Sequence, residues 1–146
     1  MKIGVIGAGR LGICFALLCE AAGYDVLVSD IREDYVNGLN DRKITTNEPE
    51  VENLLRVAKN FKATTDNKEV IRECDLIYTL VATPSLEDGS YDVSAVWNVV
   101  EDIKEEIESN PKKKYFVIGC TTNPGDCENF KKQLPSCVSV FYNPEF

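Results

Sequence analysis

The sequence Gly7-Ala8-Gly9-Arg10-Leu11-Gly12 follows directly on a short apolar run, Ile3-Gly4-Val5-Ile6, and opens a segment with helical periodicity. A G-x-G-x-x-G pattern alone also fits a tight turn in an unrelated α/β protein. Between a strand and a helix it is typical of a dinucleotide-binding loop. Gly7 would allow the turn, Gly9 would let the backbone approach a pyrophosphate, and Gly12 would let the helix pack closely on the strand. The residues expected to contact the dinucleotide here are Gly7, Ala8, Gly9, Arg10, Leu11 and Gly12.

Asp30 ends the second apolar run, Val26-Leu27-Val28-Ser29. A carboxylate at this position can accept hydrogen bonds from both hydroxyls of an adenosine ribose, and it would repel a 2′-phosphate. We therefore predict NAD rather than NADP as the cofactor. Arg32 keeps NADP open, because an arginine here could bind a 2′-phosphate. We interpret it instead as a solvated residue at a helix start, beside Glu33 and Asp34.

Short apolar runs alternate with helical periodicity along the whole chain. Strands that alternate with helices imply parallel βαβ units and a sheet covered on both faces. We therefore predict an α/β fold, a Rossmann-type doubly wound sheet that is mostly parallel, with six strands and helices on both faces. The expected strands lie at residues 2–6, 25–29, 61–64, 75–81, 115–119 and 137–142. The expected helices lie at residues 10–22, 32–39, 50–59, 67–73, 92–109 and 125–133.

The 146 residues suit one domain, and a content of 44% hydrophobic residues is enough for a core. The net charge of −8 argues against a nucleic-acid partner or an anionic membrane surface, because both favour a basic face. The sequence contains no apolar run as long as a membrane span, and the first strand begins too early to leave room for a signal peptide. We therefore expect a cytoplasmic protein.

The chain contains no histidine, which excludes Ser-His triads, histidine general bases and the usual zinc sites. Its six cysteines form no C-x-x-C pair, so we predict no metal site. Cys14, Cys19 and Cys74 lie in apolar stretches, where a thiol packs as a small hydrophobic group. We expect Cys120 to be the only cysteine at the ligand-binding edge of the sheet, and we assign it to packing.

Ligands of open α/β sheets bind beyond the carboxyl ends of the strands. This rule points to four segments of the chain, and the terminal Asn143-Pro144-Glu145-Phe146 lies at the same edge. The four segments are Gly7–Gly12, Asp30, Val81–Ser85 and Cys120–Gly125.

These segments give the chain a resemblance to the N-terminal, NAD-binding domain of the UDP-glucose/GDP-mannose dehydrogenase family, over essentially its whole length. Many families share the glycine pattern and Asp30. The further motifs are far more specific in combination: Asn47-Glu48-Pro49, Val81-Ala82-Thr83-Pro84, Thr121-Thr122-Asn123-Pro124-Gly125 and the terminal Asn143-Pro144-Glu145-Phe146. Enzymes that this chain resembles use NAD to oxidise a sugar-nucleotide alcohol twice, to the acid.

The resemblance implies roles for individual residues. Thr121 and Thr122 would lie near the nicotinamide end of the cofactor, and Thr122 would help to position a catalytic water. Glu145 would act in base catalysis at the reacting centre, although the residue alone would suggest a surface carboxylate at a strand end. The residues that would line the cofactor after the fourth strand are Val81, Ala82 and Thr83.

Some positions depart from the family's pattern. Cys120 takes the place of a lysine, Glu50 that of a glycine, and Tyr35 that of a basic residue. These departures leave the predicted cofactor unchanged, but they weaken the assignment of a particular substrate.

The resemblance also implies a covalent mechanism. A cysteine thiolate traps the aldehyde from the first hydride transfer, and the second hydride transfer leaves a thioester that water hydrolyses. That cysteine belongs to a later substrate-binding domain. We therefore expect residues 1–146 to form one NAD(P)-binding Rossmann domain that catalyses little alone. The full-length enzyme would be a homo-oligomer that acts on a nucleotide sugar of UDP-glucose type, at the C6 alcohol.

Two other functions stay open at this point. One is an NAD-linked hydroxyacid or 6-phosphogluconate-type dehydrogenase, against which the N-P-E-F and T-x-P-G sequences argue. The other is a non-catalytic, nucleotide-sensing Rossmann module, which would not need a glutamate and paired threonines at the nicotinamide end.

Overall fold

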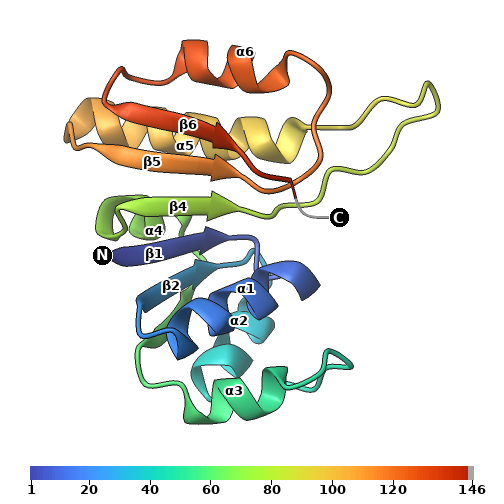
Figure 1. The fold of residues 1–146 in the computed structure, drawn as a ribbon, viewed down its shortest axis with the longest axis vertical. Coiled ribbons are helices and arrows are strands. Elements are labelled where there is room, and N and C mark those ends of the chain that lie inside the picture. The colour runs from blue at the N-terminus through green and yellow to red at the C-terminus, as the bar shows by residue number, and fades with distance from the viewer. Residues whose placement is uncertain (145–146) are drawn as a thin grey trace.

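The computed structural model describes residues 1–144, which form one parallel sheet of six strands together with six helices (Figure 1). The strands are β1 (Lys2–Ile6), β2 (Asp25–Ser29), β3 (Phe61–Thr64), β4 (Leu76–Thr79), β5 (Lys114–Ile118) and β6 (Val138–Tyr142). The helices are α1 (Arg10–Ala21), α2 (Glu33–Asn40), α3 (Val51–Val57), α4 (Asn67–Glu73), α5 (Ser94–Ser109) and α6 (Asp126–Gln133). The strands lie in the order β3-β2-β1-β4-β5-β6. The predicted Rossmann-type, doubly wound fold is confirmed.

Helices cover both faces of the sheet, and each face has its own hydrophobic core. On one face α1, α2 and α3 pack against strand residues that include Val5 and Val28. On the other face α4, α5 and α6 pack against Ile6, Ile77 and Phe116. Successive side chains of a strand point to opposite faces, so a strand buried on both faces is apolar at nearly every position. This explains the unbroken apolar runs of the sequence.

β4, α3 and α5 are shorter than predicted, and the other elements agree with the prediction to within one residue at each end. α3 spans Val51–Val57 rather than residues 50–59, because Glu50 before it is left-handed and Ala58 after it is extended. β4 ends at Thr79 rather than at residue 81, because its partners on both sides end beside it, at Ile6 and Ile118. α5 begins at Ser94 rather than at residue 92, because Asp92 lies before the helix and its carboxylate accepts a hydrogen bond from the Ser94 N–H at 2.9 Å.

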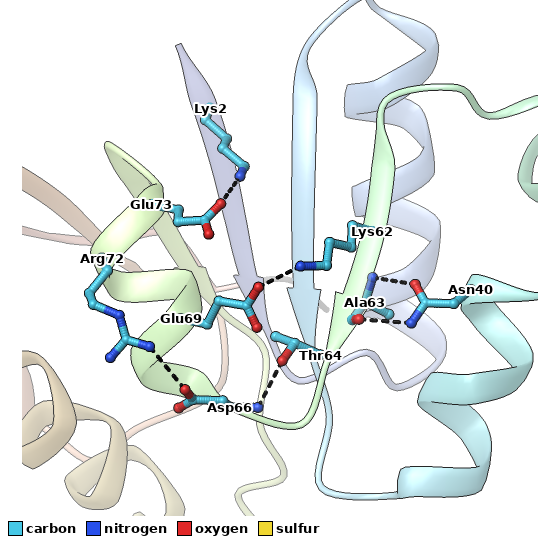
Figure 2. A network of polar contacts seen from close by, with 9 residues as sticks. All are labelled: Lys2, Asn40, Lys62, Ala63, Thr64, Asp66, Glu69, Arg72 and Glu73. Carbon is cyan, nitrogen blue, oxygen red and sulfur yellow. Dashed lines mark hydrogen bonds and ion pairs between the residues drawn. The ribbon is translucent and has the colours of Figure 1, made fainter.

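Two ion pairs connect α4 to strands β1 and β3 of the sheet (Figure 2). Lys62 of β3 pairs with Glu69 at 2.6 Å, and Lys2 of β1 pairs with Glu73. Exposed pairs of this kind contribute about 1 kcal/mol or less each, so they orient the helix more than they stabilise the fold.

The free edge of β3 is closed by a side chain (Figure 2). The Asn40 amide donates to the carbonyl oxygen of Ala63 at 2.9 Å and accepts from the Ala63 N–H at 2.8 Å. An open strand edge would present these backbone groups to another chain, so Asn40 at the end of α2 protects the sheet at this point.

Candidate dinucleotide-binding site

The loops after β1 and β4 meet where the strand order reverses. Gly7 has a φ angle of 95°, which residues with a side chain rarely adopt. A Cβ atom at Gly7 would also lie 2.7 Å from the backbone oxygen of Leu80, so the two loops touch there. The glycine loop therefore lies beside the segment that leads into Val81–Thr83, at the point where open α/β sheets bind their ligands.

Gly9 and Gly12 have opposite surroundings. A Cβ atom at Gly12 would lie 1.9 Å from the carbonyl oxygen of Gly7, whereas a Cβ atom at Gly9 would meet no described heavy atom within 4 Å. Gly9 is the N-cap of α1 and supplies no side-chain cap. α1 therefore begins beside open space, and backbone N–H groups at a helix start favour an anion such as a pyrophosphate. This geometry agrees with the turn and packing roles expected of Gly7 and Gly12, and the ligand role of Gly9 stays a prediction.

Asp30 lies at the end of β2, is 8% exposed, and faces the glycine loop. Its Oδ2 atom accepts a hydrogen bond from the Ala8 N–H at 3.2 Å. The Arg32 guanidinium covers the carboxylate, with Nε 2.8 Å from Oδ1 and Nη2 2.9 Å from Oδ2. It also lies 4.2 Å from the centre of the Tyr35 ring. Arg32 is the N-cap of α2 and its side chain is 56% exposed, as predicted for a solvated residue at a helix start, but its ion pair with Asp30 was not predicted.

The charge state of Asp30 follows from these contacts. Burial by itself would raise the pKa of the carboxyl, but hydrogen bonds and the charge of Arg32, together with the Ala8 N–H, outweigh it. The pKa of Asp30 therefore lies below its ordinary value. Asp30 is ionised at neutral pH and acts there as an acceptor of hydrogen bonds.

The Asn47–Pro49 motif also reaches this site. Glu48 lies 3.6 Å from the guanidinium Nε of Arg10 at the start of α1. Glu50 follows with a φ angle of 62°, and α3 begins after it, at Val51. A left-handed conformation is unfavourable for a residue with a side chain. This explains why the family that the chain resembles has a glycine at this position.

A second part of the edge is a hollow of about 460 Å³ at the carboxyl ends of β5 and β6. The residues that line it are Thr122, Asn123, Pro124, Gly125, Cys127, Glu128 and Tyr142. The Thr122 hydroxyl lies 3.6 Å from the Cys127 sulfur. The prediction that Cys120 is the only cysteine at this edge is therefore wrong. Cys120 itself is buried, which raises its pKa to about 11 and agrees with a packing role.

Asn123 joins the loop before α5 to the start of α6. Its side-chain amide accepts from the Tyr91 N–H at 2.8 Å and donates to the Tyr91 carbonyl at 2.9 Å. Its backbone N–H donates to the Asp126 carboxylate at 2.8 Å. The sequence gives no sign of this role, because Tyr91 lies far from Asn123 along the chain and no local pattern links the two residues.

Two of the predicted segments leave the sheet from neighbouring strands. Val81–Thr83 follows β4 and Thr121–Thr122 follows β5, and these strands pair in parallel as far as Thr79 and Ile118. Both segments therefore lie at the ligand edge, as predicted. Their contact with a cofactor stays a prediction.

The terminal motif is anchored through Asn143. The Tyr78 hydroxyl donates to the Asn143 carbonyl at 2.9 Å, and the Asn143 N–H donates to the Ile118 carbonyl at 3.0 Å. Both contacts hold the start of the motif beside the carboxyl ends of β4 and β5. Glu145, for which a catalytic role is predicted, lies outside the described residues.

Residues 1–144 contain no metal-binding cluster and no membrane-spanning helix. Within them, no three His, Cys, Asp or Glu side chains lie close enough together to hold a metal ion. Among the helices of this described part, none has both the length and the apolar character needed to cross a bilayer.

The sequence profile of the UDP-glucose/GDP-mannose dehydrogenase family, NAD binding domain, matches residues 1–146. The chain belongs to this family. It is an NAD-binding Rossmann domain, and the related proteins are NAD-dependent sugar-nucleotide dehydrogenases. The open start of α1 and the ionised Asp30 fit the pyrophosphate and the ribose of this cofactor.

Relatives over the whole chain include a putative UDP-glucose 6-dehydrogenase, YtcA, from Bacillus subtilis (strain 168), which is 30% identical over 152 residues. The GDP-mannose 6-dehydrogenase of Pseudomonas syringae pv. tomato is 29% identical over 160 residues. A solved ternary complex of GDP-mannose dehydrogenase from Pseudomonas aeruginosa superimposes with a TM-score of 0.91 at 26% identity. Each match covers 100% of this chain but only 35% or 36% of the relative, so the chain spans about a third of their length.

Proposed function

We propose that this chain is the NAD-binding domain of a nucleotide-sugar dehydrogenase. The enzyme would oxidise the C6 alcohol of a sugar nucleotide of UDP-glucose type to the uronic acid, in two hydride transfers. The observation that supports this most is that one sheet edge combines the open glycine loop and Asp30 with a hollow that contains Thr122. Relatives named for UDP-glucose and GDP-mannose support the class of substrate.

The residues after β1, β2 and β4 would hold the cofactor. Gly7–Gly12 would bind the pyrophosphate through backbone N–H groups, and Asp30 would accept hydrogen bonds from the ribose. Val81–Thr83 would line the path toward the nicotinamide end, where Thr121 lies. Bound NAD supplies the hydride acceptor, and these residues orient it against the substrate.

Thr122 and Glu145 would serve the hydrolytic step. Thr122 would position the water in the hollow, and Glu145 would accept its proton. The nucleophilic cysteine would come from a separate substrate-binding domain, as the family resemblance implies. Burial raises the pKa of Cys74 to about 12 and that of Cys120 to about 11. Neither thiol supplies an appreciable amount of thiolate at neutral pH.

The remaining parts of the proposal concern the whole enzyme. Residues 1–146 would act as one cofactor domain, joined to a substrate domain, in a cytoplasmic homo-oligomer. Its partner would be the nucleotide-sugar substrate, with no nucleic-acid or membrane partner. A chain with a net charge of −8 offers little attraction to either of those surfaces.

The test is NADH production by the full-length enzyme with UDP-glucose and with GDP-mannose. Glu145→Gln is expected to lower the turnover number about 10²–10⁴-fold, the usual cost of losing a general base, with NAD affinity nearly unchanged. Glu108→Gln, which alters an exposed carboxylate of α5 away from the ligand edge, is the matched control and should keep its turnover number. Residues 1–146 alone should produce no NADH. Rapid NADH production by that domain, or a Glu145→Gln enzyme with full turnover, would contradict the proposal.

A further inference from the structure

The carboxylate of Asp30 is saturated with hydrogen bonds. Oδ1 accepts from the backbone N–H and from Nε of Arg32, and Oδ2 accepts from the Ala8 N–H and from Nη2 of Arg32. A carboxylate offers about four good acceptor positions, and these contacts use that number. The two backbone donors are fixed by the loops, whereas the two guanidinium donors can move.

The ribose of NAD needs the acceptors that the guanidinium now uses. A ribose diol donates two hydrogen bonds to the acidic residue at this position of the fold. The backbone N–H groups of Ala8 and Arg32 stay in place. The ribose diol can therefore bind Asp30 only at the two acceptor positions that Nε and Nη2 of Arg32 occupy, after the guanidinium has moved away. The Arg32 side chain is 56% exposed, so it can turn away without disturbing the core.

We propose that Arg32 is a specificity-determining residue of the cofactor site. It competes with the ribose diol of NAD for Asp30 and, once displaced, pairs with the 2′-phosphate of NADP. Arg32 therefore reduces the difference between the affinity of this domain for NAD and its affinity for NADP. This inference rests on the proposed placement of the adenosine at Asp30.

Charge and geometry around Arg32 support the second half of this inference. A guanidinium binds phosphate through two parallel hydrogen bonds, as it now binds the Asp30 carboxylate. The ring of Tyr35 lies 4.2 Å from the guanidinium and can keep it close to the ribose after it leaves Asp30. The pair of Asp30 and Arg32 is neutral overall, so it repels a 2′-phosphate less than a lone carboxylate would. Glu33 and Asp34, in the first turn of α2, add negative charge nearby and keep NAD the preferred cofactor.

Calorimetric titration of the protein with NAD and NADP tests the inference. Arg32→Ala should tighten NAD about two- to fivefold, the size expected for giving up a partly exposed ion pair, and weaken NADP about tenfold. ADP-ribose and its 2′-phosphorylated form should show the same opposite shifts, because they carry the ribose without the nicotinamide. Arg32→Lys keeps the charge but loses the bidentate geometry of the guanidinium. Its affinities for NAD and NADP should therefore fall between those of the wild type and Arg32→Ala.

Arg56→Ala is the matched control, since it removes an equal charge from α3, where Arg56 contacts Asn53. It should change both affinities by less than about twofold. Arg32→Ala values that move both cofactors in the same direction, or that weaken NAD, would overturn the inference and give Arg32 a general supporting role. A wild-type protein that binds neither cofactor would instead contradict the proposed function. Circular dichroism of each variant checks that the fold is retained.

Discussion

The two ends of the ligand edge are built in different ways. Near β1 and β2 the backbone behind the ligand edge is closely packed, since a Cβ atom at Gly12 would lie 1.9 Å from the Gly7 oxygen, and Asp30 accepts hydrogen bonds from two loops. Near β5 and β6 the chain leaves a hollow of about 460 Å³, in which Thr122 has a long contact of 3.6 Å with Cys127. The first end is preorganised, and the second is open.

This difference suggests that the end near β1 and β2 binds the cofactor and that the end near β5 and β6 accommodates the substrate and water. The backbone at the first end is already in place and loses little entropy when it binds, so most of the affinity for the cofactor should arise at the glycine loop and at Asp30, once Arg32 has left the carboxylate. An open hollow with hydroxyl and thiol groups adapts to the substrate and to water instead. Substitutions at the first end should therefore change stability or affinity strongly, and those at the second end should change affinity little.

Gly12→Ala should have the largest effect. The added methyl group meets a backbone carbonyl that cannot move without opening the β1–α1 turn, so unfolding free energy should fall by about 3 kcal/mol or more. Urea unfolding measures the change. Gly9→Ala is the control, with an expected loss under about 1 kcal/mol, because space is open there. Equal losses in the two variants would show that the loop is not packed as described.

Gly9→Val should affect binding rather than folding. The branched side chain fits the empty space in the free protein but occupies the approach to the backbone that a pyrophosphate needs. NAD affinity should fall about 100-fold, or roughly 2.7 kcal/mol, with little change in the unfolding midpoint. Calorimetry and thermal unfolding measure the two quantities. Normal binding by this variant would place the phosphates elsewhere.

The preorganised end is also the part that the sequence predicts best. Apolar runs, turn glycines and Asp30 act through local backbone geometry, and local patterns record such requirements directly. For this reason the order of strands and helices and the position of the glycine loop agree with the prediction, apart from a few residues at the ends of β4, α3 and α5. The end of β4 depends on where its neighbouring strands stop, which is a tertiary property.

The contacts that the sequence did not predict are made by side chains in loops and at helix starts. Arg32 folds back on Asp30, Cys127 turns toward Thr122, and Asn123 pairs with the backbone of Tyr91. None of these pairings follows from residue type or spacing, because each depends on the path of a loop. The open end of the site is formed largely by such contacts, and it was therefore predicted less completely.

The stability that Asp30 contributes should depend on pH. Its pKa is lowered in the folded state, so its contribution is present above the unfolded value, about 3.9, and is lost as the pH falls through the folded value. At pH 7 Asp30→Asn should be less stable than the wild type by about 1 kcal/mol. The difference should shrink toward zero below about pH 4. Urea unfolding of both proteins, from about pH 2 to about pH 7, measures the difference. A constant difference across that range would mean that the carboxylate charge is not what stabilises the loop.

Thr122→Ala should have the smallest effect on cofactor affinity. The hydroxyl has a long contact with the Cys127 sulfur and lines an open hollow, so its loss leaves no buried donor without a partner. The NAD affinity of Thr122→Ala should differ from that of the wild type by less than about threefold, against about 100-fold for Gly9→Val, and Thr122→Ser should match the wild type.

In the full-length enzyme the same substitution should lower turnover, because a misplaced water slows hydrolysis. The turnover number should fall about tenfold or more, while KM for NAD stays constant. Calorimetry and steady-state kinetics separate the two effects. A loss of NAD affinity of about 100-fold in Thr122→Ala would mean that the open end contributes to binding as much as the preorganised end does.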